Sequence, residues 1–270
     1  MPQSWQIHPN VTQASWRSTA SLVNLELRDV AKPTAQPGTA LVRIRAVAVN
    51  ARDLMVIAHD PVYPTNALPG ISPCSDGAGV VEAVGEPSVW KVGDRVILAQ
   101  NSWINGLDAG VRFVRDDHLL RAPKNLSFEE AAVIPTAGET AANALFFGPM
   151  RTGKGVTVLT QGTGGVSTFA IQLAAAAGAT VIAISSSDEK LELARRLGAR
   201  ETINYRQHPD WDKEVQKLTN GRGVDHVVEV GGAGTIIKSL GSLRQGGLVS
   251  IIGILTPSQR LDLMPELLYG

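Results

Sequence analysis

Residues 161–167 read Gln-Gly-Thr-Gly-Gly-Val-Ser and lie between two segments of different character. The preceding run, Gly155 to Thr160, is apolar and typical of a buried strand, and the following run, Thr168 to Ala174, is typical of a helix. A strand, a glycine-rich turn and a helix in this order form a dinucleotide-binding fingerprint. A glycine-rich turn alone is often only a loop, but here both flanking elements match it.

The small residues of this turn have separate roles in the fingerprint. Gly162 permits the tight turn, Gly164 lets the backbone approach a pyrophosphate, and Ser167 allows the helix to pack closely on the strand. The helix N-terminus adds free N–H groups and a positive dipole end, which favour phosphate. The residues predicted to bind the dinucleotide here are Gly162, Thr163, Gly164, Gly165, Val166 and Ser167.

Strands and helices alternate through the rest of this half, which predicts a parallel sheet covered by helices. The predicted strands are Thr180–Ile184, Glu201–Tyr205, Val224–Val230 and Leu248–Gly253. The predicted helices are Ser187–Leu197, a segment from Pro209 to near Gly221, and Thr235–Leu243. This order is that of a doubly wound Rossmann domain.

The first half of the chain has a different texture. Short β-branched runs, Ala40–Val49, Gly79–Gly85 and Gly93–Leu98, are separated by close-spaced turns and predict a compact, barrel-like β domain. Residues 127–130, Ser-Phe-Glu-Glu, form a capping-box pattern that begins a helix. The sequence therefore predicts an α/β protein with a β-rich first domain.

Composition narrows the classes of partner. The formal net charge is zero, so there is no electrostatic reason to expect nucleic acid or an anionic membrane as a partner. Cys74 is the only cysteine, which excludes an intrachain disulfide and makes a cytoplasmic location the default. No stretch reaches the roughly 18 apolar residues that a membrane helix needs.

The end of the second predicted strand determines which dinucleotide is expected. An NAD site usually has Asp or Glu there, but this chain has Ser185, Ser186 and Ser187, followed by Lys190 and, after the third strand, Tyr205. Hydroxyl groups beside a cation suit a 2′-phosphate, so we predict NADP. The alternative is that Ser186 or Ser187 only caps the next helix, with Glu189 completing a capping box, and that Lys190 is a solvated surface residue.

With these motifs together, the chain resembles the medium-chain dehydrogenase/reductase superfamily, in the zinc-independent branch of quinone oxidoreductases and enoyl reductases. The resemblance covers nearly all of residues 23–255. It rests on Val49–Leu54, Ser75–Val81, Val92–Val96, Leu126–Ala132, the turn at Gly162, and Gly221–Asp225. It implies a GroES-like catalytic domain over residues 1–128 and a Rossmann domain over residues 129–270, with the active site between them.

Zinc-dependent members of the family bind their catalytic metal through Cys, a Gly-His-Glu motif and a second Cys. The corresponding positions here hold Asn50, Ser75 followed by Asp76, and Thr136, so the family's ligands are not kept. Cys74 is interpreted as a small buried side chain rather than a ligand or nucleophile. We therefore expect no bound metal.

The resemblance also assigns roles near the nicotinamide. It implies that Asn50 and Thr140 lie near the ring and that Gly253 and Ile254 contact its carboxamide. Asp53 is either a third catalytic residue or the partner of a nearby arginine in a turn. The implied activity is hydride transfer from NADPH to a small quinone, enone or similar acceptor. The alternatives are an NADPH-binding protein without turnover, an inactive fragment, and, disfavoured by the missing ligands, an alcohol dehydrogenase.

The chain ends soon after the fifth predicted strand of the Rossmann domain. The resemblance implies several dozen further residues, which supply a sixth strand at the dimer edge and a segment that returns to the barrel domain. We therefore expect a Rossmann domain that lacks its last strand and a C-terminally truncated chain. The homodimer that is usual in the family is then in doubt.

Overall fold

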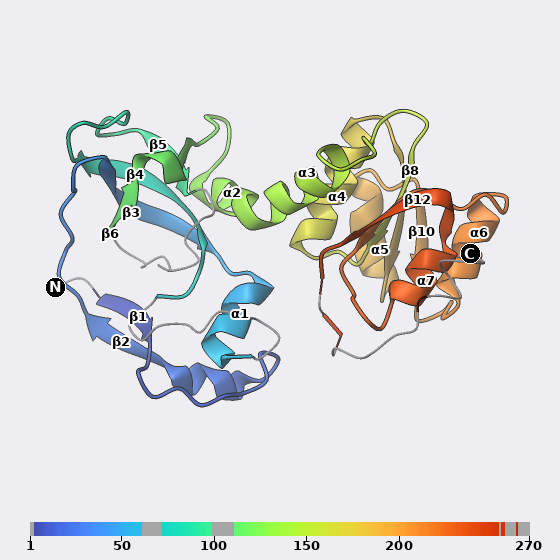
Figure 1. The fold of residues 1–270 in the computed structure, drawn as a ribbon, viewed down its shortest axis with the longest axis horizontal. Coiled ribbons are helices and arrows are strands. Elements are labelled where there is room, and N and C mark those ends of the chain that lie inside the picture. The colour runs from blue at the N-terminus through green and yellow to red at the C-terminus, as the bar shows by residue number, and fades with distance from the viewer. Residues whose placement is uncertain (1–2, 61–71, 99–110, 254, 257–262, 264–270) are drawn as a thin grey trace. The chain divides into compact units, whose positions relative to one another are not determined.

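The computed structural model describes residues 3–60, 72–98, 111–253, 255–256 and 263 of the chain (Figure 1). The chain divides into two compact units, Met1–Thr136 and Ala137–Gly270. Within the described residues, no helix combines the length and the apolar character needed to cross a bilayer.

The first unit is built on antiparallel strands. Five of them form one sheet in the order β6-β3-β4-β5-β7, and β1 and β2 pair separately. The strands are β1 (Gln3–Ile7), β2 (Leu25–Asp29), β3 (Thr39–Ala48), β4 (Asp76–Val84), β5 (Arg95–Leu98), β6 (Val111–Arg115) and β7 (Leu119–Arg121). The helices are α1 (Ala51–Ala58) and α2 (Phe128–Ala132), with short 3₁₀ turns at Thr19–Asn24 and Asp116–His118.

The predicted capping box is confirmed at the start of α2. Ser127 Oγ accepts a hydrogen bond from the amide of Glu130, and Glu130 Oε2 accepts one from the amide of Ser127, at 3.1 and 2.8 Å. The buried side of the sheet is lined by short and β-branched residues of β3, β4 and β5, including Val42, Val81 and Val96. The β-branched runs predicted as strands therefore bury one face of this antiparallel sheet.

The second unit is a parallel five-stranded sheet in the order β10-β9-β8-β11-β12. Its strands are β8 (Thr157–Gln161), β9 (Thr180–Ser185), β10 (Glu201–Asn204), β11 (Val224–Glu229) and β12 (Leu243–Ile251). Its helices are α3 (Glu139–Phe146), α4 (Gly165–Ala176), α5 (Asp188–Arg196), α6 (Trp211–Leu218) and α7 (Ile236–Gly241), and a π-helical turn covers Ile134–Gly138. The order reverses between β8 and β11, which is where ligands bind in open α/β sheets.

Two apolar clusters cover the faces of this sheet. One joins α3, α4 and α5 to Val158 and Val181, and the other joins α6 to Leu159 and Ile182. Consecutive residues of β8 and β9 thus enter opposite clusters, as the period of a strand requires. All four strand residues are at most 2% exposed, so the strands are buried on both faces and read as continuous apolar runs.

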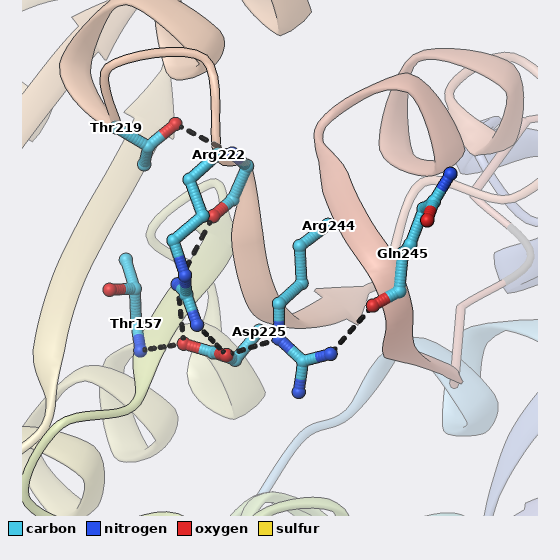
Figure 2. A network of polar contacts seen from close by, with 7 residues as sticks. Thr157, Thr219, Arg222, Asp225, Arg244 and Gln245 are labelled. Carbon is cyan, nitrogen blue, oxygen red and sulfur yellow. Dashed lines mark hydrogen bonds and ion pairs between the residues drawn. The ribbon is translucent and has the colours of Figure 1, made fainter.

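The amino ends of three strands are joined by one carboxylate (Figure 2). Asp225 in β11 accepts hydrogen bonds from the amide of Thr157 in β8 at 2.8 Å and from Arg244 Nε in β12 at 2.5 Å. Arg222 adds a bidentate pair at 2.6 and 3.1 Å. Burial alone would raise the pKa of Asp225, but these donors outweigh it and hold the pKa at about 2.

The predicted elements are found, with one clear difference in position. We predicted a helix over Thr235–Leu243 and a strand from Leu248, but α7 ends at Gly241 and β12 already begins at Leu243. Ser242 is the C-cap of α7, and both its amide and its hydroxyl donate to Lys238 O. Leu243 then pairs with Val224, and a register shift follows before Leu248 pairs with His226. Such an irregular strand start lacks a clean period of two in the sequence.

Candidate cofactor and substrate site

The glycine-rich turn lies between the carboxyl end of β8 and the N-terminus of α4. Gly162 has φ +74°, a left-handed conformation that favours glycine, and its amide bonds to Ile184 O at 2.6 Å. Gly164 is the N-cap of α4, and a Cβ placed on it would meet no heavy atom of the described structure within 4 Å. The first turn of α4 has no acidic residue. The turn therefore leaves open space before an uncompensated positive helix end, which fits a pyrophosphate.

The rest of the turn has fixed positions. Ser167 is 3% exposed, and its hydroxyl donates to the backbone oxygen of Gln161 at 2.6 Å, so the third small residue ties the helix to the strand. Gly165 packs near Ala137, since a Cβ there would lie 3.2 Å from the Ala137 methyl group. Thr163 and Val166 are partly exposed beside them.

The residues predicted to select the cofactor meet at the carboxyl ends of β9 and β10. Ser185 ends β9 and is buried, Ser186 and Ser187 are partly exposed, and Lys190 is exposed on α5. The amide of Tyr205 donates to Ser185 O at 3.0 Å, which brings the end of β10 beside the serines. Ser187 is the N-cap of α5, but its side chain makes no capping hydrogen bond. The Ser187 side chain therefore does not cap α5, contrary to the alternative in which a serine serves only as a helix cap.

Acidic groups also lie near this end. Asp188 and Glu189 stand in the first turn of α5, and Asp188 accepts from Asn204 Nδ2 at 2.8 Å and from Gln207 Nε2 at 3.2 Å. Two neutral amides therefore occupy Asp188. Both donors lie at the carboxyl end of β10 or just after it.

The fifth strand reaches the same edge of the sheet. The amides of Ile252 and Gly253 donate to Glu229 O at 2.9 and 3.1 Å. A Cβ on Gly253 would lie 1.7 Å from Val230 O, so only glycine permits this approach. Ile254, the second residue predicted to contact the carboxamide, lies outside the described residues.

A buried carboxylate that the sequence analysis did not single out lies at this edge. Glu229 ends β11 and is 0% exposed, and its oxygens accept from Gln161 Nε2 and from the hydroxyls of Thr235 and Ser239. They also accept from the amides of Gly231 and Gly232 at 2.7 and 2.9 Å. The available signal was an acidic residue that ends an apolar strand directly before two glycines.

The first unit gathers the positions that correspond to the family's zinc ligands. Asp76 is 0% exposed and accepts from Asn50 Nδ2 at 3.0 Å, from Ser75 Oγ at 3.1 Å, and from the amide and hydroxyl of Thr136 at 2.9 and 2.6 Å. The resemblance therefore identified positions that do lie together. What joins them is a carboxylate that accepts four hydrogen bonds.

Asp53 has a local partner on each side. Its Oδ2 accepts from the amide of Asn50 at 2.7 Å, and its Oδ1 lies 3.3 Å from Arg52 Nη1. The carboxyl group is 2% exposed, and burial raises its pKa. This is the turn-stabilising arrangement that the sequence left open beside a catalytic role.

Cys74 differs from the expected buried side chain. It is half-buried, and its φ of +74° is uncommon for a residue with a Cβ. Burial, followed by the nearby Asp53 and Asp76 carboxylates, raises the pKa of the thiol to about 12. The side chain therefore remains a thiol at neutral pH.

Thr140, the third predicted catalytic residue, belongs to the second unit. It lies in the first turn of α3 and is partly exposed. Among the described residues, no three His, Cys, Asp or Glu side chains are grouped closely enough to hold a metal ion.

Family profiles match both units of the chain. The alcohol dehydrogenase GroES-like domain matches residues 36–141, and the zinc-binding dehydrogenase profile matches residues 165–269. These matches confirm the predicted fold class, a GroES-like domain followed by a Rossmann domain.

Relatives and solved structures agree with this match. A zinc-type alcohol dehydrogenase-like protein of Schizosaccharomyces pombe is 44% identical over 239 residues, covering 80% of this chain and 68% of that protein. A quinone oxidoreductase of Pseudomonas aeruginosa is 35% identical over 231 residues, covering 85% and 69%. The crystal structure of Escherichia coli quinone oxidoreductase complexed with NADPH has a TM-score of 0.80 at 26% identity, covering 96% of this chain and 76% of that one.

These matches, together with the glycine-rich turn at the switch point of the sheet, identify an oxidoreductase fold with a site for a nicotinamide dinucleotide. The chain belongs to the medium-chain dehydrogenase/reductase superfamily, in its quinone oxidoreductase-like branch.

Proposed function

We propose that this protein is an NADPH-dependent reductase that delivers a hydride to a quinone, an enone or a similar activated acceptor without zinc. The observation that carries the proposal is the Asp76 cluster. Asn50, Ser75 and Thr136 occupy the positions of the family's metal ligands, and each donates a hydrogen bond to one buried carboxylate.

The donors of this cluster do not suit a tetrahedral zinc ion. Zinc sites use thiolate, imidazole or carboxylate ligands, whereas two of the three positions carry a neutral hydroxyl and the third an amide. The one thiol nearby, Cys74, has its pKa raised to about 12 and is a poor source of thiolate. We therefore assign no metal to the reaction.

NADPH, when bound, supplies the hydride and most of the chemistry. The residues of the second unit hold it, with the turn at Gly162–Ser167 on the pyrophosphate and Ser186, Ser187 and Lys190 on the 2′-phosphate. The Ser187 side chain makes no capping hydrogen bond in α5, so its hydroxyl is available to donate.

Residues of the first unit can polarise the acceptor. The contact with Asp76 uses one of the two N–H groups of Asn50 Nδ2 and fixes the orientation of the amide. The second N–H can donate to a carbonyl oxygen, where negative charge develops as the hydride arrives. The hydroxyl of Thr140, which belongs to the second unit, is a further candidate donor. Hydride transfer leaves a hydroquinone monoanion that takes up one proton from water, so no buried general acid is required.

The decisive experiment is a screen of NADPH oxidation by the purified protein over quinones, enones and aldehydes, with elemental analysis of the same sample. We expect turnover with a quinone or an enone and less than stoichiometric zinc. Stoichiometric zinc together with alcohol oxidation would favour the second candidate, a zinc alcohol dehydrogenase, which the name of the Schizosaccharomyces pombe relative suggests. Binding of NADPH without turnover would favour a non-catalytic dinucleotide-binding protein.

The preference for NADPH has its own test in Lys190→Ala. Removal of the ammonium group should weaken NADPH binding by about tenfold or more and leave NADH binding nearly unchanged, because only NADPH carries the 2′-phosphate. Calorimetry with both dinucleotides measures this. Lys154→Ala is the matched control, since Lys154 is an exposed lysine at the amino side of β8. Equal affinity of the unmodified protein for both dinucleotides would contradict the assignment.

A further inference from the structure

Glu229 is a buried acidic residue that the proposed chemistry does not use. Glu229 is the last residue of β11 and lies beside Gln161, the last residue of β8, at the switch point of the parallel sheet. An acidic side chain with 0% exposure requires hydrogen-bond partners for both oxygens. The identity of these partners indicates what the residue does.

The two oxygens of Glu229 hold different loops. Oε1 accepts from the Gly231 and Gly232 amides and from the Thr235 hydroxyl at 2.6 Å, and so shapes the turn after β11. Oε2 accepts from Gln161 Nε2 at 2.7 Å and from the Ser239 hydroxyl. All five donors are uncharged, so the carboxylate acts as an acceptor centre rather than as half of an ion pair.

Gln161 passes this contact on to the glycine-rich turn. Its Oε1 accepts from the amides of Val230 and Gly231 in the turn after β11, both at 3.2 Å, and its Nε2 donates to Glu229 Oε2 and to Ser239 Oγ, both at 2.7 Å. Its backbone oxygen accepts from Ser167 Oγ in α4, and Gly162 follows it directly. The position of the pyrophosphate turn therefore depends on a side chain whose other end is fixed by Glu229.

The loop after β12 joins the same centre. The Gly253 amide donates to the backbone oxygen of Glu229, and Thr256 bonds to the turn through its amide and hydroxyl to Gly231 O, at 2.9 and 2.8 Å. Three loops at the carboxyl ends of β8, β11 and β12 are thus attached to one residue. These are the loops on which the proposed dinucleotide site is built.

We propose that Glu229, through Gln161, is the positioning residue that sets the affinity of this protein for its nicotinamide dinucleotide. The proposal rests on the proposed cofactor site. It states that the hydrogen-bond polarity of the pair, an acceptor at position 229 and a donor at position 161, keeps the three loops in their binding arrangement before the dinucleotide arrives. Such preorganisation lowers the cost of ordering the loops on binding.

The test exchanges the hydrogen-bond donor and acceptor between positions 161 and 229. Glu229→Gln places an amide N–H₂ group against Gln161 Nε2, so two donors face each other and the side-chain hydrogen bond between the carboxyl ends of β8 and β11 is lost. The double variant Gln161→Glu with Glu229→Gln restores every contact, because the carboxylate at 161 accepts from the amide at 229 and from Ser239. The backbone amides at 230–232 keep their acceptors.

Two readouts are measured on the full chain. Calorimetry with NADPH should show binding weakened by about tenfold or more in Glu229→Gln and recovered to within about threefold in the double variant. Hydrogen exchange without cofactor should show faster exchange at Gly231, Gly232 and the Gly162 turn in the single variant, and protection regained in the double variant.

The control is Asp225→Asn, at the opposite end of the same strand. It lowers stability but leaves the loops in place, so NADPH affinity should stay within about twofold of the unmodified protein. Unchanged affinity in a folded Glu229→Gln protein, or a double variant that is folded but not rescued, would overturn the inference. If the unmodified protein binds no dinucleotide while the exchange pattern holds, the proposed function fails instead. If Glu229→Gln does not fold, Thr235→Val, which removes one donor to Oε1, takes its place with the same criteria.

Discussion

β11 has a buried carboxylate at each end, and the two are stabilised in different ways. Asp225, at the amino end, is paired with Arg222 and Arg244, and its pKa is held at about 2 (Figure 2). Glu229, at the carboxyl end, accepts from five uncharged donors. Both join β8 to β11, but only the carboxyl end has its partners in the loops on which the proposed dinucleotide site is built.

This difference follows from what each end must do. At the amino end the partners are long, partly exposed side chains, so a cation can be supplied from the surface without being buried. At the carboxyl end, where the dinucleotide site is proposed, a cation beside the carboxylate would also attract phosphates and compete with the helix N-terminus. Neutral donors fix the loops and leave the electrostatics of the phosphate site to α4.

The largest effect should come from removing the carboxyl-end acceptor. Glu229→Ala removes the acceptor shared by five donors, two of which belong to the buried residues Gln161 and Ser239, and should lower the free energy of unfolding of the second unit by roughly 3–5 kcal/mol. Urea unfolding measures this, and Asp225→Ala is the comparison. If Glu229→Ala lowered the free energy of unfolding less than Asp225→Ala does, the carboxyl end of β11 would not contribute more to stability than the amino end.

The middle of the same strand should respond to pH. His226 is 0% exposed, its Nε2 lies 2.8 Å from Ser250 Oγ, and its Nδ1 has no hydrogen-bond partner among the described residues. Burial lowers the pKa of His226 to about 4. The unfolded chain therefore takes up a proton near pH 6.5 that the folded protein refuses until about pH 4. Stability is lost as the pH falls through this window, by about 2.5 kcal/mol between pH 7.5 and pH 4.5.

His226→Leu should remove this dependence, apart from the contributions of other groups. The measurement is the free energy of unfolding of both proteins at the two pH values. An identical loss in the variant would show that His226 does not cause the acid sensitivity.

The amino end should respond at lower pH. Asp225→Asn should cost about 2 kcal/mol at neutral pH, since the pKa falls from 3.8 to about 2 on folding. The folded pKa is depressed, so this stability is present above about pH 4 and lost as the pH falls towards 2. Unfolding curves of the variant and the unmodified protein should therefore converge only at strongly acidic pH. Convergence already near pH 5 would contradict the ion-pair assignment.

The smallest effect is expected from Arg222→Ala. The Arg222 side chain is 52% exposed, and Arg244, at 30%, continues to pair with Asp225 when it is removed. The shift in the urea midpoint should be less than half that of Asp225→Asn. A shift as large as that of Asp225→Asn would mean that Arg222 alone neutralises the carboxylate.

Much of the local structure follows from the sequence alone. Strand periodicity, the turn at Gly162 and the capping box at Ser127 depend on residues within a few positions of one another, and all three are present in the structure. The resemblance likewise identified Asn50 and Thr136 as positions that lie together, which the shared contact with Asp76 confirms. Short-range backbone preferences and family spacing are sufficient for such predictions.

Only the tertiary structure decided which polar groups meet. Gln161 and Glu229 are 68 residues apart, as are Thr157 and Asp225, and each pair meets because β8 and β11 are neighbours in one register. The early start of β12 at Leu243 is also set by pairing with Val224 rather than by its own residues. Local propensity carries no information on strand order, and so the sequence shows the acidic residues of β11 without showing which donors they bind.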